Sequence, residues 1–176
     1  MIDLTRDRLD EARFFLSKLQ QHKAAQAQPR KPPPEHFRYY LSAFVNAARS
    51  VPWVLQSEEK EKYDVWIGSW EAKRTLEEEA LLKLTKEMRN TSVKQGHIET
   101  TTRSEEVPIP TNPDPYQIGA LRVHALRLRE GGGPWTISDV HFVELQGTEQ
   151  EIVTVCEDYT DHLTRLVQDF MDKHPQ

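Results

Sequence analysis

Most of the chain places apolar residues at the three- and four-residue spacing of an amphipathic helix. In residues 35–56, for example, Phe37, Leu41, Phe44 and Ala48 recur on one face. We therefore expect a mainly α protein, an up-and-down bundle of about five helices. The predicted helices cover residues 3–27, 35–56, a third segment that begins at Ser57, 76–95 and 148–172.

Local signals at the ends of these segments set their expected boundaries. Ser57 is followed by two glutamates and is a suitable N-cap for the third helix. Thr148 and Glu151 have the spacing of a capping box at the start of the last helix. Pro52 lacks an amide hydrogen, so we expect it to kink the second helix near Arg49 or to end it early.

Every predicted helix carries an apolar stripe that we expect to be buried in one core. Cys156 lies on the last of these stripes, so we interpret it as a small core residue, and as the single cysteine it excludes an intramolecular disulfide. The remaining stripes consist of Leu9, Ala12, Leu16 and Leu19 in the first helix, Tyr63, Trp66, Ile67 and Trp70 in the third, and Leu81, Leu84 and Met88 in the fourth. In the last helix the stripe comprises Ile152, Val155, Tyr159, Leu163, Leu166 and Phe170.

Two segments interrupt the helical pattern. Residues 29–34 end in three consecutive prolines, which predict a stiff connector or a proline-rich ligand for an aromatic groove on another protein. Residues 98–146 favour extended chain, with a turn at 111–115. Within them, residues 121–128 and 137–145 flank a glycine-rich turn and predict a β-hairpin. We expect one domain over residues 1–176, with a helical core of 1–97 and 147–173 and an insert of 98–146.

Composition argues against general attraction to nucleic acid. The 176 residues carry a net charge of −5, so only a local basic surface is suited to contact RNA or DNA. Residues 83–103 form such an island, with five Lys or Arg against two acids. Because the chain shows neither a signal-peptide pattern nor a long apolar run, we expect a cytoplasmic protein without membrane contact.

The candidate chemistry lies at the end of the fourth helix. Arg89, Asn90, Lys94 and His97 crowd into its last turns and cap. As a structural alternative, Arg89 and Lys94 are cations that complement the helix dipole. The other histidines are scattered along the chain without metal-ligand spacing, so we predict no metal and no cofactor.

Two segments together resemble the HEPN superfamily of helical-bundle proteins. They are Phe37–Ser50 on the second helix and the stretch from Leu81 to His97 on the fourth. Many HEPN proteins are metal-independent ribonucleases in which an Arg, a polar residue and a later His meet across a homodimer cleft. The resemblance implies that Arg89 and Asn90 take the first two positions. Lys94 stands where the His is expected, and His97 follows further along.

This departure from the motif bears directly on activity. Cleavage of RNA without metal needs a base whose pKa is near the working pH and a cation for the phosphate. Arg89 suits the cation role, and His97 has a suitable ordinary pKa, whereas the reference pKa of a lysine such as Lys94 is about 10.4.

We therefore expect an HEPN-like, non-catalytic or weakly active module that binds RNA or acts in a toxin–antitoxin pair. The resemblance implies a homodimer and a nucleotidyltransferase-type antitoxin partner. The alternative is an active, metal-independent, homodimeric endoribonuclease that uses Arg89 with His97 or Lys94.

Overall fold

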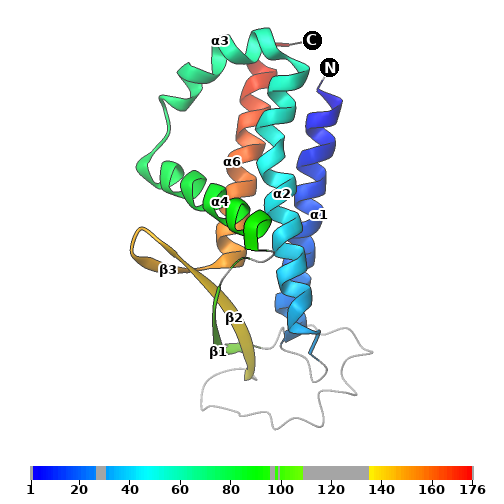
Figure 1. Ribbon diagram of the computed structural model, residues 1–176, viewed down its shortest axis with the longest axis vertical. Coiled ribbons are helices and arrows are strands. Elements are labelled where there is room, and N and C mark those ends of the chain that lie inside the picture. Colours follow the sequence, from blue (N-terminus) through cyan, green and yellow to red (C-terminus); the bar gives the residue numbers. More distant parts are fainter. Residues whose placement is uncertain (1, 27–30, 96–97, 99, 109–134, 176) are drawn as a thin grey trace.

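The computed structural model describes residues 2–26, 31–95, 98, 100–108 and 135–175. The described part is mainly helical and includes a small antiparallel sheet, which confirms the mainly α class (Figure 1). Its helices are α1 (Asp3–Gln26), α2 (Pro34–Glu58), α3 (Lys60–Glu71), α4 (Leu76–Gln95) and α6 (Ile152–Lys173). Its strands are β1 (Thr101–Pro108), β2 (Trp135–Leu145) and β3 (Thr148–Glu151).

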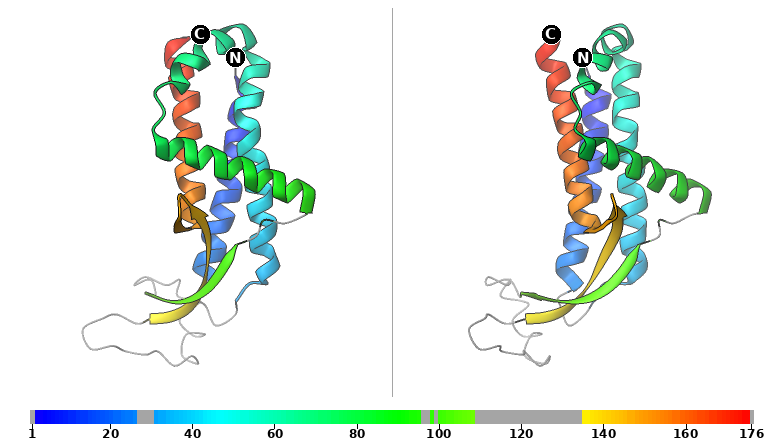
Figure 2. Two further views of the ribbon diagram at one scale, coloured as in Figure 1. Left: turned by 60° about the vertical axis from the view of Figure 1, so that its left-hand side comes forward. Right: turned by 90° about the vertical axis from the view of Figure 1, so that its left-hand side faces the viewer.

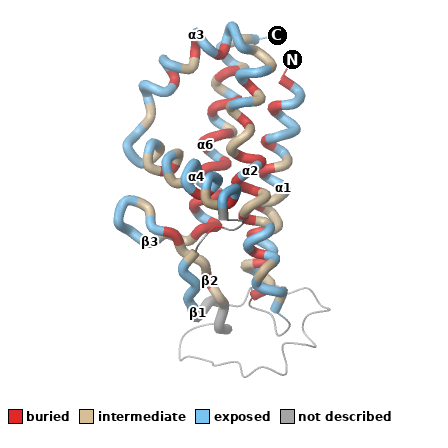
Figure 3. The backbone as a smooth tube through the Cα atoms, in the orientation of Figure 1, coloured by how far each residue is buried: buried red, intermediate tan, exposed pale blue. Residues whose placement is uncertain are grey.

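Three long helices, α1, α2 and α6, lie side by side and form the body of the molecule, with both chain ends at one end of the bundle (Figures 1 and 2). Buried positions recur along all three of these helices (Figure 3). The apolar stripes expected in α1 and α6 are buried, and so are Phe37, Leu41, Phe44, Ala48 and Val51 of α2. Cys156 is among the buried residues, and burial raises the pKa of its thiol, in keeping with a core role.

The shorter helices cover one side of this bundle. Helix α3 lies at the end near the chain termini, where Tyr63 and Trp66 contact Phe170 of α6 with ring centroids 6.5 Å and 5.3 Å apart. Helix α4 crosses α2 and α6 obliquely (Figure 2). Of its expected stripe it buries Leu81 and Met88, whereas Leu84 is only partly buried. One flank of α4 lines a hollow together with α3, and the other lines a hollow together with the sheet.

The sheet has the order β1-β2-β3 with antiparallel pairing throughout. It rests on the bundle through His141 of β2, whose ring stacks on Phe37 of α2 at a centroid distance of 3.8 Å. Phe37 also contacts the ring of His22 in α1 at 5.6 Å. A stack of three rings therefore joins α1, α2 and the sheet.

The expected start of the last helix is wrong. Thr148 and Glu151 do not form a capping box, because residues 148–151 pair with β2 as strand β3 and α6 begins only at Ile152. The turn before β3 consists of Gln146 and Gly147, whose φ angles of 53° and 75° are both positive. Two such residues form the tight turn that connects antiparallel strands, and this turn directs the chain into the sheet.

The expected start of the third helix is also wrong. Helix α2 continues through Pro52 to Glu58, so Ser57 lies inside it, and α3 begins at Lys60. The physical reason is a contact distant in sequence. The Glu58 carboxylate accepts hydrogen bonds from the backbone amides of Leu4 and Thr5 at 3.0 Å and 2.9 Å, and so caps α1.

Part of the expected insert, residues 98–146, lies within the described residues. Strand β2 includes the expected strand 137–145, and β1 confirms extended chain at 101–108. The turn at 111–115, the strand 121–128 and the glycine-rich turn lie outside the described residues, as do residues 29 and 30 of the proline segment. Among the described helices, none has both the length and the apolar character that crossing a bilayer requires.

Candidate functional site

A cavity of about 440 Å³ lies where α2, α3, α4 and α6 meet. Each helix turns one stripe of side chains toward it, as the spacing of the lining residues shows. The lining side chains with polar or aromatic groups are Arg49, Trp53 and Gln56 of α2, Tyr63, Trp70 and Glu71 of α3, Arg74 of the loop, Lys83 and Lys86 of α4, and Tyr159 and His162 of α6.

The wall of this cavity is strongly basic. Arg49, Arg74, Lys83 and Lys86 line it, and Glu71 is the single carboxylate among the described lining residues. Arg74 pairs with Glu71 at 2.6 Å, which neutralises one of the four cations. Across the described residues, no carboxylate lies within ion-pair distance of Arg49, Lys83 or Lys86. Three uncompensated positive charges therefore surround a cavity in a chain of net charge −5.

The cavity also has buried polar atoms without partners. Within the described part of the chain, the Nε atoms of Arg49 and Arg74 and the hydroxyl of Tyr159 are buried and make no hydrogen bond. All three residues line the cavity. A buried, unsatisfied polar group costs about 1–3 kcal/mol, so three around one cavity call for an explanation. Burial raises the pKa of the Tyr159 hydroxyl, although the charge of Arg49 and the nearness of the Arg49 and Thr85 side chains, which approach it without the geometry of a full hydrogen bond, oppose the shift. The group remains a protonated donor.

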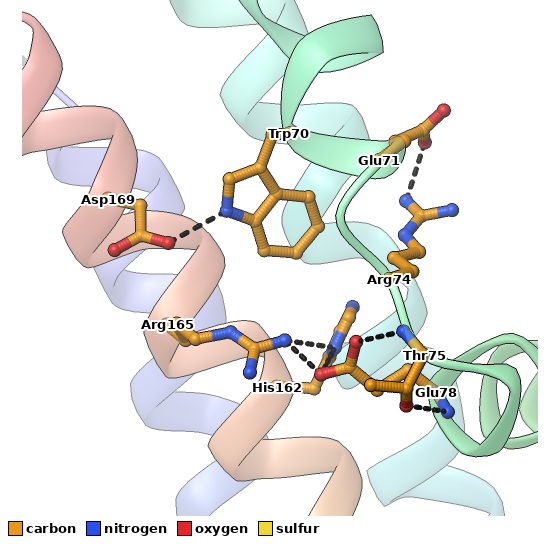
Figure 4. A network of polar contacts seen from close by, with 8 residues as sticks. All are labelled: Trp70, Glu71, Arg74, Thr75, Glu78, His162, Arg165 and Asp169. Carbon is orange, nitrogen blue, oxygen red and sulfur yellow. Dashed lines mark hydrogen bonds and ion pairs between the residues drawn. The ribbon is translucent and has the colours of Figure 1, made fainter.

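A network of polar contacts fixes the α4 end of the cavity to α6 (Figure 4). Glu78 caps its own helix: its carboxylate accepts from the Thr75 amide at 3.0 Å, and its amide donates to the Thr75 hydroxyl at 3.2 Å. The same carboxylate pairs with Arg165 of α6. Burial acts to raise the pKa of Glu78, but the hydrogen bonds and charge of Arg165 outweigh it and hold this pKa below its usual value. Glu78 is therefore a charged tie between the two helices.

His162 occupies the cavity side of this network. Burial lowers its pKa, despite the opposing charge of Glu78, so the ring is neutral near pH 7. Its Nδ1 lies 3.4 Å from Nη2 of Arg165, and a guanidinium can only donate. The same Nδ1 lies 3.7 Å from Oε1 of Glu78, and Nε2 points away from Arg165 (Figure 4). Trp70 packs edge-on against this ring at a centroid distance of 5.2 Å. Its Nε1 donates a hydrogen bond to Asp169 at 2.8 Å, and this bond fixes the position of Trp70 in the cavity wall.

The structure brings only part of the expected cluster to this region. Arg89 is exposed and lines a second hollow of about 190 Å³ together with Arg49, Ser50 and Trp53. Because Arg49 and Trp53 line both hollows, Arg89 extends the basic surface of the larger cavity.

The other members of the cluster are placed differently. Asn90 and Lys94 are exposed on α4 and line neither hollow. His97 lies outside the described residues. The sequence reasoning missed Arg49, Arg74, Tyr159 and His162, which lie on different elements. Of these residues, Arg49 could have been noticed in the sequence, because it is a charged residue between the buried positions Ala48 and Val51 of α2.

The fold and the site together define a mainly helical protein with a basic, aromatic-lined cavity between four helices. Residues 14–107 match the model of the family described as bacteriophage lambda protein ea47, and the chain belongs to this family. The match spans more than half of the chain and includes every cation named above except Arg165, whereas Tyr159 and His162 lie beyond it. No curated protein and no solved structure matches the chain.

Proposed function

We propose that this protein is an RNA-binding module without catalytic activity, and that it holds a single strand along the face shared by α2 and α4. One observation carries the proposal. Trp53 is 69% exposed, and it shares a hollow with Arg49 and Arg89, neither of which has a carboxylate partner within the described residues. An exposed aromatic ring between free cations is the arrangement with which proteins hold single strands.

The spacing of the cations supports this assignment. Lys83, Lys86 and Arg89 recur every three residues along one flank of α4, and all three are exposed. Such a row suits the regularly spaced phosphates of a strand, while a base stacked on Trp53 contributes about 1–3 kcal/mol without regard to sequence. The net charge of −5 repels RNA from the rest of the surface, which favours binding at this face.

The proposed assembly follows the HEPN resemblance. We propose a homodimer in which the ends of two α4 helices meet, with a nucleotidyltransferase-type antitoxin as a further partner. The exposed positions of Arg89, Asn90 and Lys94 support this arrangement, as does Val93, which is 65% exposed among them. An apolar side chain surrounded by polar ones suits the centre of a contact between copies.

Binding of a labelled single-stranded RNA, followed by fluorescence anisotropy in EDTA, tests the proposal. We expect Trp53→Ala to weaken binding by about tenfold, in line with the loss of one stacked base. We expect Arg89→Ala to weaken binding less and to reduce the salt dependence by about one phosphate contact. Arg8→Ala, which removes an exposed charge from α1, is the matched control and should bind like the wild type.

The same samples test the catalytic alternative, because the RNA can be analysed for cleavage after the binding measurement. Arg89 is exposed and available to a phosphate, which is the observation that favours this alternative. RNA cleavage by the wild type in EDTA that is lost in Arg89→Ala would replace the proposed module with the metal-independent ribonuclease. Equal binding by the wild type and Trp53→Ala would contradict the proposed face.

A further inference from the structure

We infer that the cavity between α2, α3, α4 and α6 is a phosphomonoester subsite, and that it receives the phosphorylated end of a bound strand. The part that concerns the strand rests on the proposed function, whereas the phosphomonoester site stands on the cavity itself. The hollow that contains Trp53 and Arg89 shares the lining residues Arg49 and Trp53 with this cavity. We therefore place the end of a strand that lies along α4 at the cavity.

The buried donors identify the chemistry of the occupant. Tyr159 is fully buried, and its hydroxyl, like the Nε–H groups of Arg49 and Arg74, lacks a hydrogen bond of full geometry within the described residues, although the Arg49 and Thr85 side chains lie near the hydroxyl. All three groups can donate at neutral pH and belong to residues that line one cavity, so an occupant with several acceptors suits them. A phosphate group has three oxygens that accept such bonds, and bonds to a charged acceptor are the strong ones.

The charges of the wall favour a dianion over a single carboxylate. Arg49, Lys83 and Lys86 have no carboxylate partner within the described residues, and the charge of Arg74 is balanced by Glu71. Lys83 and Lys86 are exposed and Tyr159 is buried, so the lysines lie at the rim and the tyrosine at the floor. A phosphomonoester carries close to two negative charges at pH 7, which suits this excess of cations.

The shape of the cavity favours the end of a strand over its interior. A volume of about 440 Å³ falls within the range of pockets that hold small ligands, about 300–1,000 Å³. Four helices wall the cavity, and its hydroxyl donor is fully buried. A terminal phosphate with one attached nucleoside brings less bulk into such a cavity than an internal phosphate, which would need to bring two flanking sugars with it.

The experiment measures how tightly the protein binds single-stranded RNAs of one sequence that end in a 5′-phosphate, a 3′-phosphate or hydroxyls only. Adenosine 5′-monophosphate, adenosine and acetate serve as the small probes. Their binding is measured by calorimetry and by the fluorescence of the cavity residues Trp53 and Trp70. The wild type should bind one phosphorylated RNA about tenfold more tightly than the hydroxyl RNA, because hydrogen bonds to charged groups are worth at least that factor. The end that gains affinity identifies the polarity of the strand.

Two variants locate the preference. Tyr159→Phe removes only the hydroxyl, and Arg74→Gln removes one guanidinium. Each should reduce the preference for the phosphorylated RNA several-fold and should weaken the binding of adenosine 5′-monophosphate by a similar factor. Tyr39→Phe removes a hydroxyl from an exposed ring outside the cavity and should retain the full preference. Helical circular dichroism verifies that all three variants are folded.

The outcomes separate this inference from the proposed function. If RNA binds with equal affinity whatever its ends, or if the preference survives in both variants, the subsite is wrong although the RNA-binding face remains. If adenosine 5′-monophosphate binds and responds to the variants while no RNA binds, the phosphomonoester site holds and the proposed function fails. Acetate binding as tight as the nucleotide would overturn the phosphomonoester assignment.

Discussion

At the scale of single residues, the polar groups that fix the cavity are more informative than the polar groups at the surface. Arg49, Arg74 and Tyr159 each bury an atom without a partner in the described residues, whereas Glu78 satisfies Thr75 and Arg165 at once. The unsatisfied atoms of Arg49, Arg74 and Tyr159 cost stability in the free protein, whereas the contacts of Glu78 stabilise it. This difference agrees with the inferred ligand site, in which the unsatisfied atoms would bind the ligand while Glu78 stabilises the fold.

Tyr159→Phe tests this distinction through stability. Because the hydroxyl is buried without a partner, its removal should leave the free energy of unfolding unchanged or raise it by up to about 1 kcal/mol. The phenyl ring retains the packing of the tyrosine. Urea denaturation followed by circular dichroism measures the effect. A loss of more than about 1 kcal/mol would mean that the hydroxyl makes a stabilising contact in solution.

Glu78→Gln should have the opposite effect. This change weakens the cap on α4 and the charged contact with Arg165, and we expect it to cost about 1–2 kcal/mol of unfolding free energy. Glu77→Gln is the matched control, since Glu77 is exposed in the same turn and has no contact of this kind among the described residues. Equal thermal stability of the two variants would contradict a structural role for Glu78.

At the scale of elements, helix ends depend on partners that are distant in the chain. Helix α1 begins beneath the Glu58 carboxylate, which binds two of its free amides and the Thr5 hydroxyl at 2.6 Å. Glu58→Gln should therefore destabilise the protein by about 1 kcal/mol, because an amide is a weaker acceptor for a helix N-terminus. The comparison variant Glu61→Gln changes an exposed glutamate in α3. Hydrogen exchange at the amides of Leu4 and Thr5 should become faster only in Glu58→Gln.

The sequence predicts those features of the elements that depend on local periodicity. The buried stripes of α1, α3 and α6 follow from spacing alone, because one apolar face must be covered whatever the partner. The starts at Ser57 and Thr148 were wrong because contacts between elements overrode local caps. Glu58 is used by α1, and the turn at Gly147 pairs residues 148–151 with β2.

The candidate site was predictable only where its residues share a helix. Arg89 and its neighbours stand out as a polar cluster in one segment, and Arg89 does line a hollow of the basic face. Arg49 and His162, by contrast, belong to the same cavity although more than a hundred residues separate them. Only the packing of α2 against α6 brings them together, and no local pattern in the sequence reports that packing.

At the scale of the whole molecule, charge and shape are arranged on the same side. Helix α4 crosses the three-helix body obliquely (Figure 2). The basic cavity is lined by residues of α4 together with α2, α3 and α6. The remainder of the chain carries the excess of acid that gives a net charge of −5. In the proposed function, this distribution of charge would attract an anionic strand to one face and repel it elsewhere.

Two buried histidines and one partly buried histidine make the stability of the whole molecule sensitive to acid. His22 and His141 contact Phe37 between α1, α2 and the sheet, and His162 ties α6 to the α4 network. Burial lowers the pKa of each of these three rings below its usual value. The folded protein therefore keeps them neutral, while the unfolded chain takes up protons below about pH 6.5. Protons bind preferentially to the unfolded state in this range, so the free energy of unfolding must fall as the pH falls.

Urea denaturation at several pH values measures this dependence. We expect the unfolding free energy to be highest above pH 7 and to decline toward pH 5, by at most about 1.4 kcal/mol per pH unit for each histidine. His141→Gln removes one of the three rings and should make the decline shallower, whereas His36→Gln changes an exposed histidine on α2 and provides the reference. Carboxylates such as Glu78, whose pKa is lowered chiefly through Arg165, add a second decline only below about pH 4.5. A free energy of unfolding that is constant or higher at pH 5 would show that these rings are not buried neutral in solution.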